Sequence, residues 1–378
     1  MQITQVNIRD ELIDFANGQP GVSILPTELI EQAAADCFSR HDPEMLKYGP
    51  EQGDAHFLES LSKFLTPRYG FPVHRDELLV TTSNSTSIDL VCAMFTKPGD
   101  TVFIEEPTYF LAPKILQVDY ALNVIPIPVD EDGMSLDALE VALAKHQPKF
   151  VYTIPTYHNP TGHSMSQERR ERLHQLAQEN NFLIIADEVY QLLSYHENRP
   201  PPLAMAQFTS GNKVISLGSF SKILAPGLRL GWVQTGPELM ERFITFGKIV
   251  SSGSLNHMVS GIVRSAIDLG LQAEYLEKIK GIYKHRIDLM DEALHRYLPN
   301  SISWKKPEGG FFFWLTLPDG VSATDLAKRA DPHNIGFVPG PICSNVKGLD
   351  NKIRLSFAFY DDEEIIEGCR RLGELFKT

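Results

Sequence analysis

The sequence predicts an α/β fold: a large domain in which helices flank a mostly parallel sheet of seven strands, and a smaller α+β domain. The first reason is the stretch 78–234, where short apolar segments alternate with helical patterns. Such runs are typical of strands that are buried on both faces and joined by crossover helices. The second is the length of 378 residues, which is too great for one ordinary core. We expect residues 50–250 to form the large domain, and residues 1–49 and 251–378 to form the small domain with an N-terminal arm.

Two helices are predicted ahead of the sheet. The first spans 27–40, where apolar side chains recur at helical spacing behind a capping residue, Thr27. The second spans about 55–69. Segments 15–21 and 47–53, rich in glycine and proline, are predicted to be the loops on either side of the first helix.

The seven strands of the large sheet are predicted from short apolar runs. They are 78–81, 101–105, 123–127, 150–153, 183–186, 214–217 and 230–234. Helical patterns near 85–95, 109–118, 135–146 and 166–180 separate most of the first five. Ligands of such sheets bind beyond the carboxyl ends of the strands, so polar residues at those ends are the first candidates for a site.

Beyond residue 237 the pattern changes to that of the small domain. A long helix is predicted over about 273–297, and a helix over 362–376 closes the chain. Between them lie three predicted strands, 302–304, 310–315 and 352–358. We expect the N-terminal helix to complete this α+β lobe.

The charge balance argues against a nucleic-acid partner. Lysine and arginine number 35 against 48 aspartate and glutamate residues, which gives a net charge of −13 and a pI near 5.4. A phosphate backbone would be repelled by this charge. The content of 43% hydrophobic and 22% charged residues is that of a soluble globular protein.

The distribution of cysteines and apolar residues predicts a cytoplasmic protein without a metal site. The four cysteines, Cys37, Cys92, Cys343 and Cys369, are widely spaced and have no histidine at metal-ligand spacing, so we expect reduced core thiols. No export signal precedes the first helix, and nowhere do about 18 apolar residues occur together. We therefore expect no membrane partner.

A polar loop at 216–232 carries one lysine, Lys222, with Ser219 and Ser221 beside it and Arg229 seven positions later. A lysine amine can condense with an aldehyde, and serine hydroxyls and an arginine fork are good phosphate ligands. We read Gly218 and Gly227 as positions where the backbone approaches a ligand. A solvated strand connection remains the alternative for this loop taken alone, because such loops are common.

Three other strand ends carry polar residues of the same kind. Asn84 and Ser85 begin a predicted helix, where free backbone N–H groups could hold an anion or the serine could simply cap the helix. Tyr109 could stack on a flat ring or lie in the core. Asn159 could present its amide to a ligand or only shape an Asn-Pro turn.

Asp187 follows the apolar run at 183–186 and has Tyr190 close behind it. A carboxylate in that position is costly to desolvate unless it meets a cation, such as a protonated ring nitrogen. Capping of the next helix is the alternative for Asp187. Each of these features is weak alone, but their occurrence at successive strand ends is a stronger signal.

Five motifs in order resemble the fold-type-I pyridoxal-5′-phosphate (PLP) enzymes, specifically the class I/II aminotransferases. They are Tyr-Gly-Pro (48–50), Pro-Gly-Asp to Glu-Glu-Pro-Thr-Tyr (98–109), Asn-Pro-Thr-Gly (159–162), Asp-Glu-Val-Tyr (187–190) and Gly-Ser-Phe-Ser-Lys to Gly-Leu-Arg-Leu-Gly-Trp (218–232). The resemblance extends from Asn-Gly-Gln-Pro (17–20) to Ile-Arg-Leu-Ser-Phe-Ala (353–358). It covers nearly the whole chain.

The resemblance implies a homodimeric transaminase that moves an amino group between an L-amino acid and a 2-oxo acid. Lys222 would form a Schiff base with PLP and move a proton, and Asp187 would keep the ring nitrogen protonated. The residues implied around the cofactor share a polar or aromatic side chain. They are Tyr109 stacked on the ring, Asn159 and Tyr190 at its phenolic oxygen, Asn84, Ser85, Ser219, Ser221 and Arg229 at the phosphate, and Tyr48 reaching the phosphate of the neighbouring subunit.

The implied substrate site contains Arg354, whose fork would clamp the α-carboxylate, and Gly18, which would close over it. A surface arginine on an edge strand is the alternative for Arg354, but its apolar neighbours in the sequence argue against that. The uncharged loop 21–26 favours a donor with a neutral or apolar side chain. The histidines His158 and His163 are interpreted as turn residues rather than catalysts.

One departure from the family and two alternative functions remain. The family usually has glycine where Ser83 stands and Ser-Gln where Asn84 and Ser85 stand, which affects the phosphate contacts at 83–86. A PLP-dependent β-lyase, or a synthase of 1-aminocyclopropane-1-carboxylate, would use the same residues. A PLP-sensing module of a transcription regulator is less favoured, since only about 25 residues precede the first helix and the chain is acidic.

Overall fold

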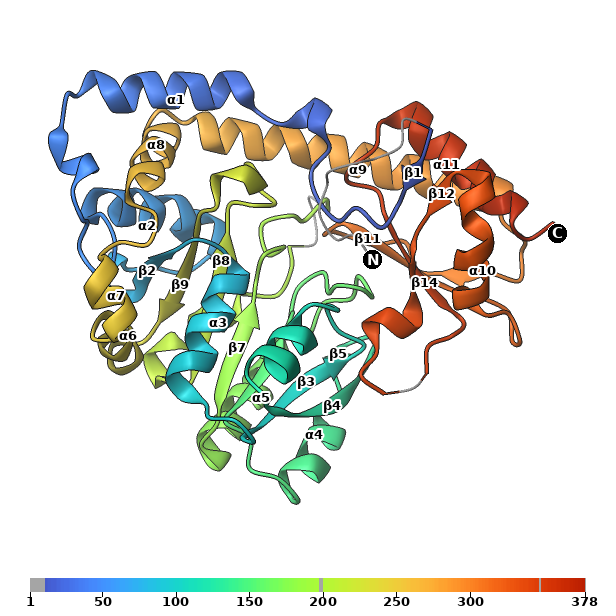
Figure 1. Ribbon diagram of the computed structural model, residues 1–378, viewed down its shortest axis with the longest axis horizontal. Helices are drawn as coiled ribbons and strands as arrows, with labels where there is room; N and C mark the ends of the chain where they lie inside the picture. The colour runs from blue at the N-terminus through green and yellow to red at the C-terminus, as the bar shows by residue number, and fades with distance from the viewer. Residues whose placement is uncertain (1–10, 197–199, 347, 378) are drawn as a thin grey trace.

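The computed structural model describes residues 11–196, 200–346 and 348–377. The first ten residues of the expected N-terminal arm lie outside these ranges. Figure 1 shows the N-terminal helix α1 along one side, the large sheet below it, and the C-terminal strands and helices gathered at the opposite end of the molecule.

The large sheet has the order β2-β9-β8-β7-β6-β3-β4-β5. Its strands are β2 Leu78–Thr81, β3 Thr101–Glu106, β4 Asn123–Asp130, β5 Gly133–Met134, β6 Phe150–Thr153, β7 Leu183–Asp187, β8 Val214–Ser219 and β9 Gly231–Thr235. The pairs between β4 and β8 are parallel, whereas β9 runs antiparallel to both neighbours and β5 forms a hairpin with β4. The α/β fold class and the seven predicted strands are confirmed, and β5 is an eighth, two-residue strand that the apolar pattern did not indicate.

Burial explains why these strands appear in the sequence as continuous apolar runs. Every residue of β2, β6, β8 and β9 is buried. The sheet therefore offers two covered faces rather than one. Helices α3 (Asn84–Phe95), α4 (Leu136–Leu143) and α5 (Gln167–Asn180) pack against it.

The helix expected near 109–118 forms in the later part of that span. Residues 112 and 113 are helical and lead into a π-helical segment, Lys114–Asp119. Pro113 lies at the start of this segment, where its missing N–H costs no hydrogen bond of the helix. The prediction of a helix in this stretch is confirmed, although the pattern did not indicate its π-helical form.

The N-terminal region contributes to both ends of the molecule. Helix α1 (Thr27–Ser39) packs on α8 (His257–Asp268), and helix α2 spans Ala55–Tyr69 as predicted. It is β1 (Ile13–Asp14), ahead of α1, that pairs with β12 (Ile335–Gly336) of the C-terminal part. The expected cap of α1 was wrong, since Pro26 holds the N-cap position and makes no side-chain cap.

The C-terminal part contains a second sheet and several helices. Its antiparallel sheet has the order β10 (Ser303–Trp304), β11 (Phe312–Thr316), β14 (Lys352–Ser356) and β13 (Val338–Pro339). The long helix α9 (Leu271–Tyr297) packs against α11 (Asp362–Glu374). The remaining α-helices are α6 Pro237–Ile244, α7 Gly247–Ser252 and α10 Ala323–Ala330, and 3₁₀ turns lie at 22–24, 43–46, 75–77, 205–211, 226–228, 331–333 and 340–343.

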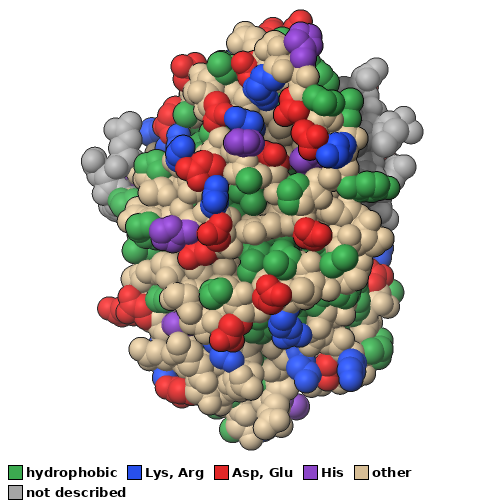
Figure 2. Space-filling model, turned by 90° about the vertical axis from the view of Figure 1, so that its left-hand side faces the viewer, with side chains coloured by type: hydrophobic (Ala, Val, Ile, Leu, Met, Phe, Trp, Pro, Cys, Tyr) green, Lys and Arg blue, Asp and Glu red, His purple; other side chains and the backbone are tan. Residues whose placement is uncertain are grey.

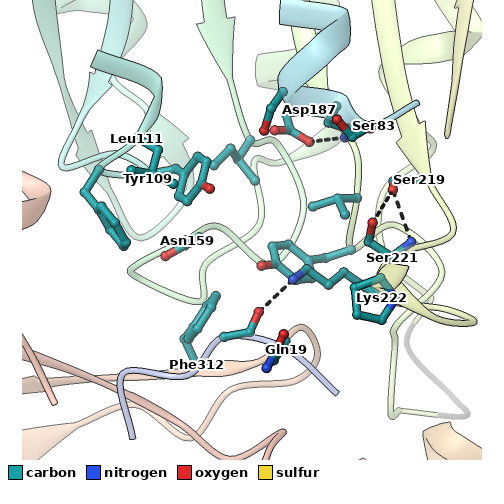
Figure 3. A pocket seen from close by; sticks show the side chains of 18 of the residues that line it. Gln19, Ser83, Tyr109, Leu111, Asn159, Asp187, Ser219, Ser221, Lys222 and Phe312 are labelled. Carbon is teal, nitrogen blue, oxygen red and sulfur yellow. Dashed lines mark hydrogen bonds between the residues drawn. The ribbon is translucent and has the colours of Figure 1, made fainter. Parts of the chain in front are cut away.

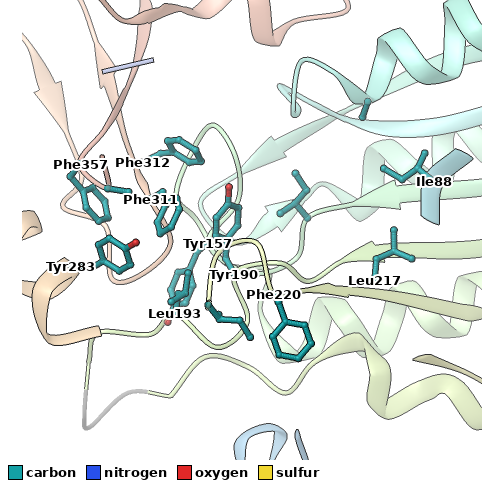
Figure 4. Close-up of a cluster of buried hydrophobic side chains, with 14 of the residues drawn as sticks. Ile88, Tyr157, Tyr190, Leu193, Leu217, Phe220, Tyr283, Phe311, Phe312 and Phe357 are labelled. Carbon is teal, nitrogen blue, oxygen red and sulfur yellow. The ribbon is translucent and has the colours of Figure 1, made fainter. Parts of the chain in front are cut away.

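An aromatic cluster joins the C-terminal sheet to the loops at the end of the large sheet (Figure 4). The ring centroid of Phe311 lies 5.0 Å from that of Tyr283 on α9 and 5.5 Å from that of Tyr190, which follows β7. Tyr190 also meets Phe312 edge to face at 6.0 Å. Such contacts add to the apolar burial and fix where the C-terminal strands meet the strand ends.

Candidate active site

A cavity of about 280 Å³ opens beyond the carboxyl ends of the large sheet (Figure 3). Its walls come from the N-terminal segment at 16–19, from loops after the strands of the sheet, and from β11 and β14. Twelve of the thirteen predicted site residues line it. They are Gly18, Asn84, Ser85, Tyr109, Asn159, Asp187, Tyr190, Ser219, Ser221, Lys222, Arg229 and Arg354.

Lys222 projects into this cavity from the loop after β8. Its Nζ donates a hydrogen bond of 2.7 Å to the carbonyl oxygen of Gly18 and lies 5.7 Å from the centroid of the Phe311 ring. Part of the side chain is open to the cavity, but the amine is deep in the protein. Burial, and then the nearby positive charge of Arg354, lower the pKa of Lys222 to about 8. About one tenth of the amine is therefore neutral at pH 7.

Asp187 is the last residue of β7, and its carboxylate is held by two donors. Oδ1 accepts a hydrogen bond from Nδ2 of Asn84 at 2.5 Å, and Oδ2 accepts one from the hydroxyl of Tyr152 at 2.8 Å. Burial raises the pKa of Asp187, while these hydrogen bonds and the charge of Lys222 oppose that rise. Asp187 is only 5% exposed, so a cationic group entering the cavity would meet a poorly solvated carboxylate.

The side chain of Asn84 therefore points elsewhere than predicted. Its Nδ2 also donates to the carbonyl oxygen of Leu217 at 3.3 Å, and because both neighbours are acceptors the amide orientation is well determined. Its Oδ1 is buried and has no partner among the described residues. The expected side-chain contact from Asn84 to a phosphate is thus replaced by a contact to Asp187, and what remains for an anion is the N-terminus of α3.

The hydroxyls predicted to hold a phosphate lie close together. Ser219 donates to Ser221 Oγ at 2.9 Å and accepts the backbone N–H of Ser221 at 3.1 Å. Arg229 has a left-handed backbone (φ 49°) and donates from Nη1 to the carbonyl oxygen of Pro226 at 3.1 Å. With Ser85 at the start of α3, these groups line one corner of the cavity and offer hydrogen-bond donors of the kind that suits an anion.

The structure gives Gly218 a role other than the predicted approach to a ligand, whereas for Gly227 that approach stays a prediction. A Cβ on Gly218 would lie 2.0 Å from Cε2 of Trp232, so this glycine is required by the packing of the indole. A Cβ on Gly227 would meet no atom within 4 Å. Gly18 shows the expected closeness, because a Cβ there would lie 2.9 Å from the Phe312 ring.

Tyr109 and Tyr190 contribute aromatic walls. Burial, and then the negative charge of Asp187, raise the pKa of Tyr109 to about 12, so its hydroxyl stays protonated. Tyr190 is buried against Phe311 and Phe312. Both rings line the same cavity as Lys222.

Arg354 lies in the middle of the second sheet rather than at an edge. Its strand β14 pairs with β11 on one side and β13 on the other, and the residue is 2% exposed. Nη1 donates to Oδ1 of Asn159 at 2.8 Å, and Nη2 donates to the carbonyl oxygen of Ala16 at 2.8 Å. The guanidinium is 4.2 Å from the centroid of the Phe312 ring. The neighbouring apolar residues therefore gave the right indication for a buried arginine.

Tyr48 is the predicted site residue that this cavity does not contain. It is 87% exposed on the loop between α1 and α2. Its predicted role concerns the site of a neighbouring subunit.

Sequence reasoning missed Tyr152, which holds Asp187, and Phe312, which packs on Arg354. Tyr152 lies inside the apolar run of β6, where its hydroxyl was the only available signal. Phe312 begins β11 and carries no chemical signal of its own. Their roles depend on contacts between segments distant in the chain.

The cavity's residues fit a phosphorylated aromatic aldehyde with a basic ring nitrogen. Lys222 offers a partly neutral amine, Asp187 a buried carboxylate for a cation, and the corner at Ser219 and Arg229 offers donors for an anion. The partnerless Oδ1 of Asn84 is a further buried polar atom beside Asp187. In the ranges that the structure describes, no cluster of three or more metal-ligating side chains occurs, and none of the helices there is long and apolar enough to cross a bilayer.

Comparisons with known proteins agree with this site. The family model "Aminotransferase class I and II" matches residues 10–372. The chain is 32% identical over 372 residues to aromatic-amino-acid aminotransferase 1 of Thermococcus litoralis, covering 97% of this chain and 88% of the relative. It is 34% identical over 380 residues to 2-aminoadipate transaminase of Thermus thermophilus, and this match covers 100% of this chain and 93% of the relative.

A solved structure gives the same result. The α-aminoadipate aminotransferase LysN of Thermus thermophilus, complexed with N-(5′-phosphopyridoxyl)-L-leucine, superposes with a TM-score of 0.87 at 33% identity. The match covers 98% of this chain and 93% of LysN.

Proposed function

The chain belongs to the class I and II aminotransferases and is a PLP-dependent transaminase, and we propose that the cavity around Lys222 is where it moves an amino group between an L-amino acid and a 2-oxo acid. The observation that carries this proposal is the meeting of Lys222, Asp187 and Arg354 in one cavity. When bound, PLP supplies an electron sink for the pair of electrons left at the substrate Cα after proton removal.

Lys222 is proposed as the residue that binds the aldehyde of the cofactor and then moves the proton. Its pKa of about 8, lowered from 10.5, leaves the amine mostly protonated at pH 7 but with a neutral fraction far larger than that of an exposed lysine. A base with such a pKa can take a proton at Nζ and return it, which is what general acid–base catalysis requires. The carbonyl oxygen of Gly18, 2.7 Å away, holds the amine toward the N-terminal segment.

Asp187 is proposed to hold the proton on the ring nitrogen. The hydrogen bonds from Asn84 and Tyr152 fix both carboxylate oxygens, so the carboxylate is oriented before the cofactor arrives. Tyr109 would stack on the ring, while Asn159 and Tyr190 would donate to its phenolic oxygen.

The phosphate is proposed to bind at the corner formed by the α3 N-terminus and the loop after β8. Ser85, Ser219, Ser221 and Arg229 line this corner. Asn84 would contribute through its backbone at the start of α3, because its side chain is engaged by Asp187.

Arg354 is proposed to bind the substrate α-carboxylate, with Asn159 beside it and Gly18 closing over it. The remainder of the lining favours a neutral or apolar side chain: Ile88, Phe110 and Leu111 are apolar. The relatives in Thermococcus and Thermus are named for aromatic amino acids and for 2-aminoadipate. We propose an aromatic or large apolar donor, because the apolar wall offers no additional positive charge for a second carboxylate.

A homodimer with shared active sites is proposed. Large hydrophobic side chains lie exposed on the face that carries α1, α2 and α7, and Figure 2 shows hydrophobic side chains among charged ones there. They include Leu46 at 72%, Val250 at 53% and Tyr48 at 87% exposure. Exposed apolar groups of this kind are typical of an interface, and Tyr48 would then reach the phosphate of the neighbouring subunit.

Residues 50–250 are proposed to act as the large, PLP-binding domain, with 1–49 and 251–378 as the small domain. A cytoplasmic location is proposed because all four cysteines are free and buried, as expected in a reducing compartment.

Transamination is favoured over elimination, because the family model and the two relatives described above are named for aminotransferases. Those names give no support to a PLP-sensing module.

The test is a panel of amino donors, with 2-oxoglutarate and pyruvate as acceptors, assayed on the wild-type enzyme and on Lys222→Ala. The wild type should form a new amino acid most rapidly from aromatic and large apolar donors, and Lys222→Ala should form none. A Lys222→Ala enzyme that still transaminates would contradict the role of the lysine. Release of ammonia in place of a new amino acid would indicate elimination.

A further inference from the structure

A buried carboxylate and two histidines lie directly behind the proposed substrate site, and the reaction proposed above does not use them. Glu105 and His158 are fully buried, and His163 is mostly buried. Glu105 lies near the end of β3, whereas both histidines belong to the loop that follows β6. Buried charged groups are costly unless they are satisfied, so this cluster calls for a role.

Glu105 ties the end of β6 and the following loop to β3. Its Oε1 accepts a hydrogen bond of 2.7 Å from the hydroxyl of Thr153, and its Oε2 accepts one of 2.8 Å from the backbone N–H of Ile154. Nε2 of His158 lies 3.1 Å from Oε2, in the geometry of an ion-pair contact rather than a linear hydrogen bond. Burial alone would raise the pKa of Glu105, but His158, then His163 and then the N–H of Ile154 outweigh it, so the pKa of Glu105 is lowered and the group stays a carboxylate.

The other side of His158 is bound by the turn itself. Nδ1 lies 2.9 Å from the hydroxyl of Thr161 and accepts the backbone N–H of Thr161 at 3.4 Å. Because a backbone N–H can only donate, Nδ1 is its acceptor, and Nε2, which faces Glu105, carries a proton. His163 stacks on His158 with ring centroids 4.6 Å apart.

Backbone hydrogen bonds close the same turn. The N–H of Gly162 donates to the carbonyl oxygen of His158 at 2.7 Å, and the N–H of His158 donates to that of His163 at 2.8 Å. Asn159 follows His158 in this turn and lines the cavity, where its Oδ1 accepts the 2.8 Å hydrogen bond from Arg354. The direction of the Asn159 amide therefore depends on a turn whose buried anchor is Glu105.

We propose that Glu105 and His158 are positioning residues for the substrate carboxylate, acting through the 158–163 turn on Asn159 and Arg354. This inference rests on the proposed function, because it assumes that Arg354 binds the α-carboxylate. Neither Glu105 nor His158 is among the residues that line the cavity, so their effect would be indirect.

The test compares two substrates on the holoenzyme: an L-amino acid donor, and the matching primary amine that lacks the carboxylate. Removing the anchor in His158→Phe should lower kcat/KM for the amino acid about tenfold, the size expected for one displaced hydrogen bond, mainly through KM. Binding of the amine, followed by the absorbance of the cofactor, should change by no more than about twofold, because no carboxylate is involved. His158→Gln, whose amide can reach toward Glu105, should recover part of the loss.

A double-mutant cycle identifies the route. If His158 acts through Asn159, adding His158→Phe to Asn159→Ala should cause little further loss. Losses that multiply, or an equal loss with the amine, would overturn the proposal. Should His158→Phe fail to fold, the near-isosteric Glu105→Gln takes its place with the same expectations, and unchanged amino-acid kinetics in that variant would also overturn it.

Arg354→Lys separates this inference from the function on which it rests. If Arg354→Lys leaves KM for the amino acid unchanged, the carboxylate role of Arg354 is wrong, and the inference falls with it. If Arg354→Lys raises KM but the His158 and Glu105 variants do not, the positioning role alone is wrong.

Discussion

Replacing Lys222 by methionine should stabilise the cofactor-free protein at neutral pH while abolishing its activity. The structure places the amine where its charge is poorly solvated, so that its pKa falls from 10.5 to about 8. At about 1.4 kcal/mol per pKa unit, this difference corresponds to no more than about 3.5 kcal/mol of free energy of unfolding. Because part of the side chain is open to the cavity, water screens the charge, and we expect a gain of about 1–2 kcal/mol for Lys222→Met.

The pH dependence distinguishes this effect from ordinary packing. Below about pH 8 the amine is protonated in both folded and unfolded chains, so the wild type carries the full cost of the buried charge. As the pH rises from about 8 toward 10.5, the folded protein releases the proton that the unfolded chain still binds, and the wild type becomes more stable. The advantage of Lys222→Met should therefore be complete at pH 7 and mostly lost by pH 10.

Urea unfolding, followed by circular dichroism at equal protein concentrations, measures the difference at both pH values. Lys63→Met, which removes an exposed amine on α2, is the matched control and should show no such change with pH. A Lys222→Met protein no more stable than the wild type at pH 7 would refute the reasoning. So would a gain of the same size at pH 7 and pH 10, because it would come from packing and not from the charge.

Three further substitutions test the proposed roles. Arg354→Lys should lower kcat/KM for the amino donor by about 10- to 100-fold, because a lysine cannot make the bidentate contact. Steady-state kinetics measures this loss, and the cofactor spectrum should stay unchanged. An unchanged KM would contradict the role of Arg354. Asp187→Asn should lower kcat by about 100- to 1,000-fold, the size typical of losing one preorganised electrostatic group. Absorbance should show that this variant still binds PLP. Near-normal turnover would contradict the role of Asp187. Tyr152→Phe removes one of the two donors to Asp187 and should lower kcat by about tenfold, whereas a loss as large as that of Asp187→Asn would show that Tyr152 does more than orient the carboxylate.

The strands and the main helices could be predicted because their signals are local. Helix α2 lies at the predicted residues, and Asp54 caps it by accepting the N–H of Phe57 at 2.7 Å. The run at 214–217 appears as an apolar strand because every residue of β8 is buried. The spatial order of the strands could not be predicted from such patterns. No local sequence pattern indicates that β9 runs antiparallel between β2 and β8.

The candidate site was predictable as a set of residues and less so as a set of contacts. The motifs named the residues that line the cavity, because chemistry-bearing side chains at strand ends have to meet there. The direction of the Asn84 amide and the hydroxyl of Tyr152 could not be predicted, since both depend on how β6, β7 and α3 pack together. The same holds for Glu105 and His158, which are 53 residues apart and meet only in the fold.

The central claim is that Lys222 is the residue that holds PLP, and it can be tested directly by fixing the cofactor in place. The holoenzyme is reduced with borohydride, digested, and its peptides are mapped by mass spectrometry. A pyridoxyl group is expected on Lys222 and on no other lysine. A pyridoxyl group on a different lysine, with the Lys222 peptide unmodified, would contradict it.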